Sequence, residues 1–476
     1  MSNLLMEKMT QFITEAQYND LPEELIDLTK LAIIDTIGVS LAGWKESAVE
    51  IVKNVYTLES NAQNGASLWG EPTKTSIENA ALVNGTASHV LDFDDAAPSV
   101  IIHPSAPILS AVIPLAEKLG SSGKDVITAY AIGTEVMLRL GQLVDLKHYQ
   151  LGWHSTATLG TIGAAAACAY LLNLNKEECS NAIAIAASMS SGLRKNFGTM
   201  TKSFHVGLAA SQGIQAASLA KNGFTGSNEI FGESGFLNAF TGGENVEQIH
   251  NLIKTIEFGK PFDILQSGLS VKKFPCCYGT HKLIHGVLTI KEEANITLKD
   301  VEEISIVLPP GQLMPLVHSR PVTGLQGKFS AEYTALAALK DGFIKLSTFE
   351  DEKVMDKEIQ NNLPLVKVSE LEGTTKTSQE IEEIPVQVVI KSKDGQQFKK
   401  EVLNAPGSKA TPLSDQEHRE KWIDCLSQYA KTMNIPIEQI VEKANLQYNN
   451  ALKIESYNNF SDWIIEIHQQ VALTGN

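Results

Sequence analysis

Three aspartates and a histidine are the first residues of the chain whose types and spacing suit acid–base chemistry. Asp92, Asp94 and Asp95 lie within four residues in the segment LDFDDAAPSVIIHPSAP (91–107), and His103 follows them. Carboxylates this close repel one another, so either some of them face water or one has a raised pKa or a cationic partner. A solvated loop with helix-capping aspartates is the simpler alternative. The apolar residues on both sides favour an interior position, where acids and a histidine are candidates for general acid–base catalysis.

A second histidine stands at a predicted helix start. His154 in GWHSTATLG precedes Ser155 and Thr156, either of which can cap the helix that follows. The histidine is then either a packed, hydrogen-bonded residue or a proton carrier beside a helix N-terminus that helps to hold a substrate carboxylate.

Cations are concentrated in the segment GLRKNFGTMTKSFHVG. Arg194, Lys195, Lys202 and His205 fall within twelve residues, between alanine-rich segments that read as buried helices. Lysines are rarely buried without a partner, and the partner here is either a substrate carboxylate or a neighbouring aspartate. No GxGxxG or Walker pattern accompanies the local glycines, so the segment does not indicate a nucleotide site.

A fourth candidate segment is VKKFPCCYGTHKLIH. Lys272 precedes a Pro-Cys-Cys turn, and His281 and His285 follow four residues apart. Adjacent cysteines rarely bridge each other, so we expect Cys276 and Cys277 to be free thiols. The histidine pair lacks the glutamate of HExxH and nearby ligands of suitable spacing, which disfavours a zinc site.

The elements that must position these residues change in character along the chain. Residues 1–262 read as helices, and the small-residue stretch LGTIGAAAACAYLL suits a buried helix with close neighbours. Residues 263–403 contain two alternating segments, VEEISIVLPP and IPVQVVIKSKDG, around a helical SAEYTALAALKDGFI. The helical period returns in residues 404–476. We therefore predict a mainly α protein, with a large helical domain from both chain ends and a smaller α+β lid domain of residues 263–403.

Composition excludes several classes of protein. The chain has 476 residues, and its formal net charge of −16 disfavours a broad nucleic-acid surface. No stretch approaches the length of a membrane span, and the N-terminus does not resemble a secretory signal. Five cysteines without a framework spacing fit a reducing compartment, so we expect a cytoplasmic protein. An anionic substrate would require a local group of cations.

The ordered set of motifs resembles the MmgE/PrpD family. The motifs similar to that family are IDTIGVSLAG, ALVNGTASHVLDFDD, HPSAP, GWHSTATLGTIGAAAA, FGTMTKSFHVGLAASQG, KNGFTG, KKFPCCYGTH and GKFSAEYTALAAL, spanning residues 34–339. The family includes 2-methylcitrate dehydratases, cis-aconitate decarboxylases and iminodisuccinate epimerases. The set is specific to the family and much less specific to one activity within it.

The resemblance implies a homodimer, an active site between the domains, and no metal or organic cofactor. By position it assigns catalytic roles to Asp92, His103, His154 and Lys202. Lys272 and His281 are further pocket candidates from the lid, and we add Arg194 and Cys277 as candidate substrate contacts.

Departures from the family pattern narrow the activity. Ala96 stands where family members commonly have threonine, Cys277 where decarboxylases have histidine, and no tyrosine precedes Arg320-Pro321. These differences disfavour cis-aconitate decarboxylation. The long insertion typical of 2-methylcitrate dehydratases between the aspartates and HPS is also missing, which disfavours 2-methylcitrate dehydratase activity.

Three classes of function remain open. The first is a lyase, either dehydratase or decarboxylase, that transfers a proton next to a carboxylate of a small di- or tricarboxylate. Lys202 would be its carboxylate clamp, and His103 and His154 its proton carriers. An epimerase of an iminodisuccinate-like dicarboxylate is the nearest alternative. A metallohydrolase using Asp94, Asp95, His281 and His285 is less favoured. A non-enzymatic binding protein is weaker still, because it would not explain the proton-handling residues.

Overall fold

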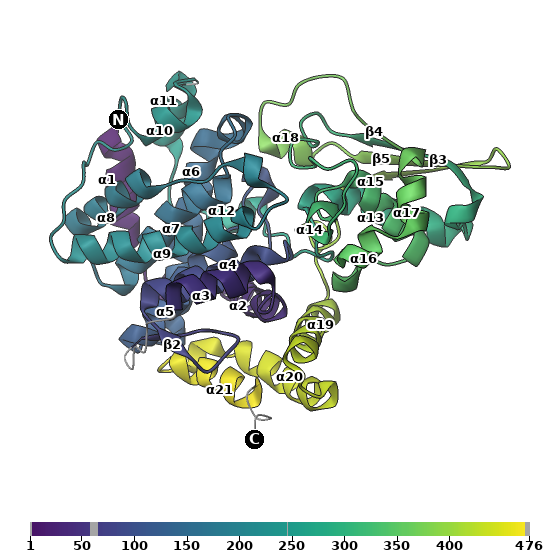
Figure 1. The fold of residues 1–476 in the computed structure, drawn as a ribbon. Helices are drawn as coiled ribbons and strands as arrows, with labels where there is room; N and C mark the ends of the chain where they lie inside the picture. Colours follow the sequence, from purple (N-terminus) through teal and green to yellow (C-terminus); the bar gives the residue numbers. More distant parts are fainter. Residues whose placement is uncertain (1, 58–64, 245, 472–476) are drawn as a thin grey trace.

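The computed structural model describes residues 2–57, 65–244 and 246–471 (Figure 1). Their side chains form two hydrophobic cores. The larger core is helical, and the smaller one surrounds a four-stranded sheet. The predicted fold class, mainly α with a smaller α+β region, is confirmed.

The larger core takes its helices from both ends of the chain. From the N-terminal side they are α1 (Ser2–Glu15), α2 (Glu23–Ala42), α3 (Ser47–Thr57), α4 (Ile77–Val90), α5 (Ser105–Leu119), α6 (Gly123–Gln150), α7 (Ser155–Leu171), α8 (Lys176–Met189), α9 (Thr201–Lys221), α10 (Phe236–Thr241), α11 (Val246–Thr255) and α12 (Asp263–Ser267). The C-terminal helices are α19 (Asp415–Met433), α20 (Ile437–Ala451) and α21 (Ser461–Val471). A short antiparallel pair, β1 (Ala66–Ser67) and β2 (Lys74–Thr75), interrupts the helices that the sequence predicts for this region.

Small residues let the helices that carry the site pack closely. A Cβ added at Gly207 of α9 would lie 2.1 Å from the Leu82 carbonyl oxygen of α4. One added at Gly213 would lie 2.4 Å from the Cβ of Ala164 in α7. Only glycine therefore allows α9 to lie against both neighbours, and nearly every residue of α7 is buried, as its small-residue sequence predicts.

The smaller core is built on the sheet order β4-β3-β5-β6. Strands β3 and β4 are parallel, and the β3–β5 and β5–β6 pairs are antiparallel. The elements are α13 (His281–Ala294), β3 (Val301–Leu308), α14 (Gly324–Gly327), α15 (Ala331–Asp341), α16 (Asp351–Val354), α17 (Lys357–Asn362), β4 (Val366–Glu370), α18 (Ser378–Glu382), β5 (Val386–Ser392) and β6 (Gln397–Val402).

The two central strands are those that the sequence alternation predicts. β5 buries every second side chain along its length, and β3 does so from Ile304 to Leu308. The edge strands β4 and β6 are largely exposed and escaped prediction, because an edge strand has little apolar patterning to detect.

The C-terminal helix α19 packs against α2 and carries a buried cation into the larger core. The Nζ of Lys421 lies 2.6 Å from the Oδ1 of Asp35, and both side chains are almost fully buried. In the described residues, no helix is long and apolar enough to cross a membrane.

We expect Gly207→Ala to lower the free energy of unfolding by ~1–3 kcal/mol, because the new methyl group meets backbone atoms of α4 that cannot move aside cheaply. Leu219→Ala on the exposed face of the same helix is the control and should change it by less than ~0.5 kcal/mol. Urea unfolding measures both, and equal effects would contradict the close-packing interpretation.

Candidate active site

Five of the predicted site residues line one cavity between the two cores. The larger core contributes Asp92, His103, His154 and Lys202, and the α+β region contributes Cys277. The remaining lining residues are Ala96, Pro98, Ile101, Ile102, Tyr149, Thr156, Phe197, Tyr278, Gly279, Gly311, Gln312, Pro315, Phe329, Ser378, Ile381 and Glu382.

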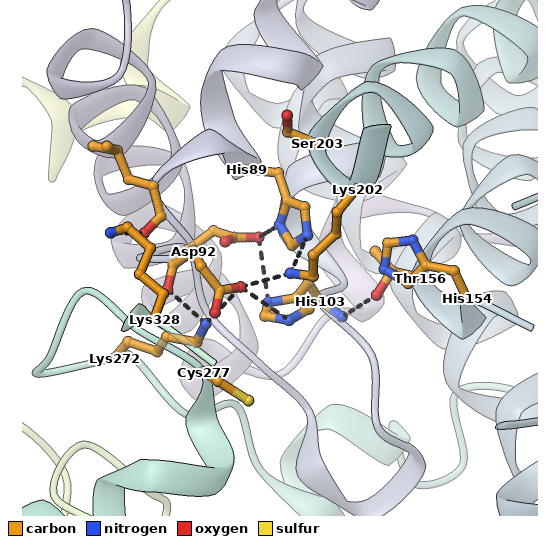
Figure 2. A network of polar contacts seen from close by, with 12 residues as sticks. His89, Asp92, His103, His154, Thr156, Lys202, Ser203, Lys272, Cys277 and Lys328 are labelled. Carbon is orange, nitrogen blue, oxygen red and sulfur yellow. Dashed lines mark hydrogen bonds and ion pairs between the residues drawn. The ribbon is translucent and has the colours of Figure 1, made fainter. Parts of the chain in front are cut away.

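Asp92 is the acid that ties the site together. It follows the C-terminus of α4 in the left-handed region of backbone space, with φ of 52°. Its Oδ1 lies 2.6 Å from the Nζ of Lys202 and 3.3 Å from that of Lys272 (Figure 2). Burial alone would raise the pKa of Asp92, but the two ammonium groups outweigh burial and hold this pKa well below its usual range. Asp92 is therefore an ionised carboxylate.

Lys202 also contacts His89, a residue that our sequence interpretation missed. Its Nζ lies 2.8 Å from the Nε2 of His89, whose Nδ1 lies 2.8 Å from Asp94 Oδ2. A lysine ammonium can only donate, so Nε2 accepts and Nδ1–H donates to the carboxylate. Burial lowers the pKa of His89 to about 4, which agrees with this neutral form. The sequence could have pointed to His89 only through Asp94, which follows it by five residues, just beyond the end of a predicted helix.

Two contacts of Lys202 are thus filled, and an ammonium has three hydrogens. The side chain also lies over the rings of Phe197 and Phe329, with its Nζ 5.2 Å from each centroid. Lys202 is fixed in position and retains one donor for a ligand in the cavity that it lines.

The tautomer of His103 follows from its partners. Its Nδ1 lies 2.8 Å from the carbonyl oxygen of Asp95, which can only accept, so Nδ1 carries a hydrogen. In the neutral ring Nε2 is then an acceptor, and it lies 3.9 Å from Asp92 Oδ1. The backbone N–H of His103 donates to the Thr156 hydroxyl at 3.1 Å. This arrangement gives His103 a basic nitrogen beside the anchored carboxylate.

His154 is paired with a second histidine. Its Nδ1 lies 3.2 Å from the Nδ1 of His205, and its Nε2 has no partner among the described residues. Burial and, next, the charge of Lys202 hold the pKa of His154 well below its usual range, so the ring is neutral. The sequence predicted that Ser155 or Thr156 caps α7. In the structure the capping position is His154 itself, and both hydroxyl residues lie within the helix.

Three buried lysines hold the turn that carries Asp92. Lys328 donates to the carbonyl oxygen of Leu91 at 2.7 Å, Lys272 to that of Asp92 at 2.7 Å, and Lys421 to that of Phe93 at 2.9 Å. Carbonyls at a helix C-terminus lack intrahelical partners and carry negative partial charge, so cations stabilise them. Lys272 therefore supports the site through Asp92 and does not line the cavity.

Two other predicted residues lie outside the cavity lining. The Arg194 guanidinium stacks on the ring of Tyr149, with its Cζ 4.5 Å from the centroid. His281 is fully buried against Phe274 and Tyr278, with both ring centroids 5.2 Å away. Burial lowers the pKa of His281 to about 3, so this ring is neutral.

Cys277 lines the cavity as a thiol, because burial raises its pKa to about 11. The five cysteines are free, as the sequence predicts.

The structure groups a different set of potential metal ligands from the one that the metallohydrolase alternative requires. His89, Asp92, Asp94 and His103 have ligand atoms within 4.8 Å of one another, and His281 and His285 are not among them. The ammonium of Lys202 already contacts two of these four groups. A divalent ion here would meet the repulsion of that buried cation.

We expect Lys421→Met to lower the free energy of unfolding by ~3–5 kcal/mol, because Asp35 then remains as a buried charge without its partner. Adding Asp35→Asn should restore part of the loss. Lys431→Met on the exposed face of α19 is the control, and urea unfolding is the measurement. A double variant that unfolds as easily as Lys421→Met alone would contradict the charge explanation.

Asp95 should make stability depend on pH. Burial and repulsion from Asp35 raise its pKa to about 8, against the hydrogen bonds from Ser105. The native state thus keeps a proton that the unfolded chain releases near pH ~4, so this contribution is complete below that pH and is lost as pH rises through about 8.

We expect Asp95→Asn to reduce the fall in Tm between pH ~5 and ~8.5, since the amide resembles the neutral acid. The exposed-site control Asp27→Asn should leave that fall unchanged. Parallel Tm curves for Asp95→Asn and the unaltered chain would rule this prediction out.

Comparisons with known proteins identify relatives of this chain. The model of the MmgE/PrpD N-terminal domain matches residues 7–249, and that of the MmgE/PrpD C-terminal domain matches residues 274–445. Similar proteins include the cis-aconitate decarboxylase of Mus musculus, 28% identical over 430 residues that cover 87% of this chain and 85% of that protein. The human cis-aconitate decarboxylase is 28% identical over 84% of this chain and 83% of its own length. That of Aspergillus terreus is 25% identical, over 70% of this chain and 71% of its own. Both halves of the chain carry the family's sequence pattern, and the chain belongs to the MmgE/PrpD family.

Proposed function

We propose that this protein is a lyase, a dehydratase or decarboxylase, that acts on a small di- or tricarboxylate by proton transfer next to a carboxylate. The observation that carries the proposal is the position of Lys202. Its ammonium is held between Asp92 and His89, and it lines the same cavity as the two candidate proton carriers, His103 and His154. The relatives named cis-aconitate decarboxylases support the same class of reaction.

Each group at the site would have its own role in the proposed reaction. Dehydration and decarboxylation both pass through a carbanion or enolate-like state beside a carboxylate. The free hydrogen of Lys202 would hold that carboxylate and the charge that develops on it, which is worth a few kcal/mol where water is excluded. Asp92 and His89 would fix the direction of the ammonium.

The two histidines would handle the proton. His103 has Nδ1–H bound to a carbonyl, so Nε2 is the nitrogen that would act as a general base. His154 offers the partner-free Nε2 in the same cavity. A base and a second proton carrier in one cavity also suit epimerisation. The stereochemistry of the product therefore distinguishes a lyase from an epimerase.

We expect His103→Ala and His154→Ala each to slow proton exchange at the substrate α-carbon by ~10²–10⁴-fold. Lys202→Met should slow it by ~10²–10³-fold or more. Lys195→Met, which removes an exposed lysine near Lys202, is the matched control and should retain full exchange. Exchange is measured by NMR in D₂O, with circular dichroism to check folding. Full exchange in both histidine variants would refute the assigned roles.

The substrate can be identified by an NMR screen of citrate, 2-methylcitrate, cis-aconitate and iminodisuccinate. We expect one of them to lose water or carbon dioxide. Chiral separation of recovered material would instead reveal inversion if the protein is an epimerase. A sample treated with a chelator and verified as metal-free should keep its activity, and loss restored by a divalent ion would favour the metallohydrolase alternative.

A further inference from the structure

The cavity has two chemically different walls. On the wall from the larger core, the ammonium of Lys202 provides a cationic donor beside the neutral His154. On the wall from the α+β region, the acidic lining residue is Glu382, at the end of α18. Among the described lining residues, Lys202 is the one lysine, and its charge is shared with Asp92.

Gln312 adds an unsatisfied acceptor to the α+β wall. It is 7% exposed, and its Nε2 donates to the carbonyl oxygen of Gly279 at 3.0 Å. This contact fixes the orientation of the amide, because a carbonyl can only accept. The Oε1 is buried and has no partner among the described residues. A buried acceptor without a partner is costly, so a ligand donor at this wall would remove the cost.

Two donor groups of the α+β region near this wall, those of Ser378 and Lys282, are engaged elsewhere. The Ser378 hydroxyl donates to Asp145 at 2.8 Å. Lys282, the cation nearest to Glu382, lies 3.5 Å from its Oε2 and donates to the carbonyls of Glu382 and Ile384. Lys282 is 1% exposed and does not line the cavity. It is therefore an ion-pair partner of Glu382 that offers no contact to a ligand in the cavity.

We propose that Gln312 and Glu382 form a subsite for a hydrogen-bond donor on the substrate, a hydroxyl, amide or ammonium group, and not for a further carboxylate. The inference deepens the proposed function and rests on it for the position of the reacting carboxylate at Lys202. A carboxylate arm at this wall would meet two acceptors, and sites built to pair with donors reject ligands that lack them by large factors.

Three probes with a common succinate portion test the subsite. They are tricarballylate, its terminal monoamide, which has the same shape with one charge fewer, and the corresponding terminal amine. Isothermal titration of the full chain should give a Kd for the monoamide at least ~10-fold lower than for tricarballylate. The amine separates charge from hydrogen bonding: binding tighter than the amide assigns the larger effect to Glu382, and weaker binding assigns it to Gln312.

Variants assign the preference to the two residues. Glu382→Gln should reduce the monoamide preference to ~3-fold or less, mainly by tightening tricarballylate. Gln312→Leu should weaken the monoamide and leave tricarballylate unchanged. Glu383→Gln, its exposed neighbour on the same helix end, is the matched control and should keep the preference of the unaltered chain.

Two results would overturn the subsite. One is tricarballylate binding as tightly as the monoamide, or more tightly, in the unaltered chain. The other is an equal effect of Glu382→Gln and Glu383→Gln. Exchange in D₂O, followed on citrate, 2-methylcitrate, cis-aconitate and iminodisuccinate, separates this outcome from failure of the proposed function. Exchange without the monoamide preference would refute the subsite alone, and the preference without exchange would refute the lyase alone. Absence of both would refute both.

Discussion

The site depends on how the chain satisfies the carbonyl groups at the end of α4. Three successive carbonyls, those of residues 91–93, each accept a hydrogen bond from a buried lysine. Lys272 and Lys328 come from the α+β side of the cavity, and Lys421 comes from the C-terminal helix. The turn is therefore held by three distant segments at once. Because its middle residue is Asp92, these same contacts place the carboxylate that anchors Lys202.

Buried charge explains the state of the histidines around this turn. A low-dielectric interior penalises an imidazolium, and the ammonium of Lys202 adds repulsion. His89 and His154 are consequently neutral, while Asp92 and Asp94 remain ionised because cations or imidazole donors contact them. The turn thus combines the charged Asp92 and Asp94 with the neutral rings of His89 and His154 around one lysine ammonium.

Membership of the family leaves the substrate open for a physical reason. Lys202, His103 and His154 belong to the larger core, whereas much of the opposite wall comes from loops and α18 of the α+β region. Side chains on that wall can change without disturbing the lysine contacts at the turn. Ala96, Cys277, Gln312 and Glu382 all line the cavity, so they are placed to alter which molecule fits beside Lys202.

The sequence by itself determined the elements and several of the chemical groups. Helical periodicity and small-residue content predicted the buried α7, and period-two alternation predicted β3 and β5, because these patterns reflect contacts within one element. Type and apolar context singled out Asp92, His103, His154 and Lys202, which the structure brings to one cavity.

Tertiary structure alone decided their partners. Lys202 reaches Asp92 across 110 residues of sequence, Lys272 reaches it across 180, and Lys421 reaches the adjacent carbonyl across 328. Local patterns carry no record of such distances, so the sequence missed His89 and the acceptors of the α+β wall. It also put Lys272, Arg194 and His281 into a pocket that none of them lines.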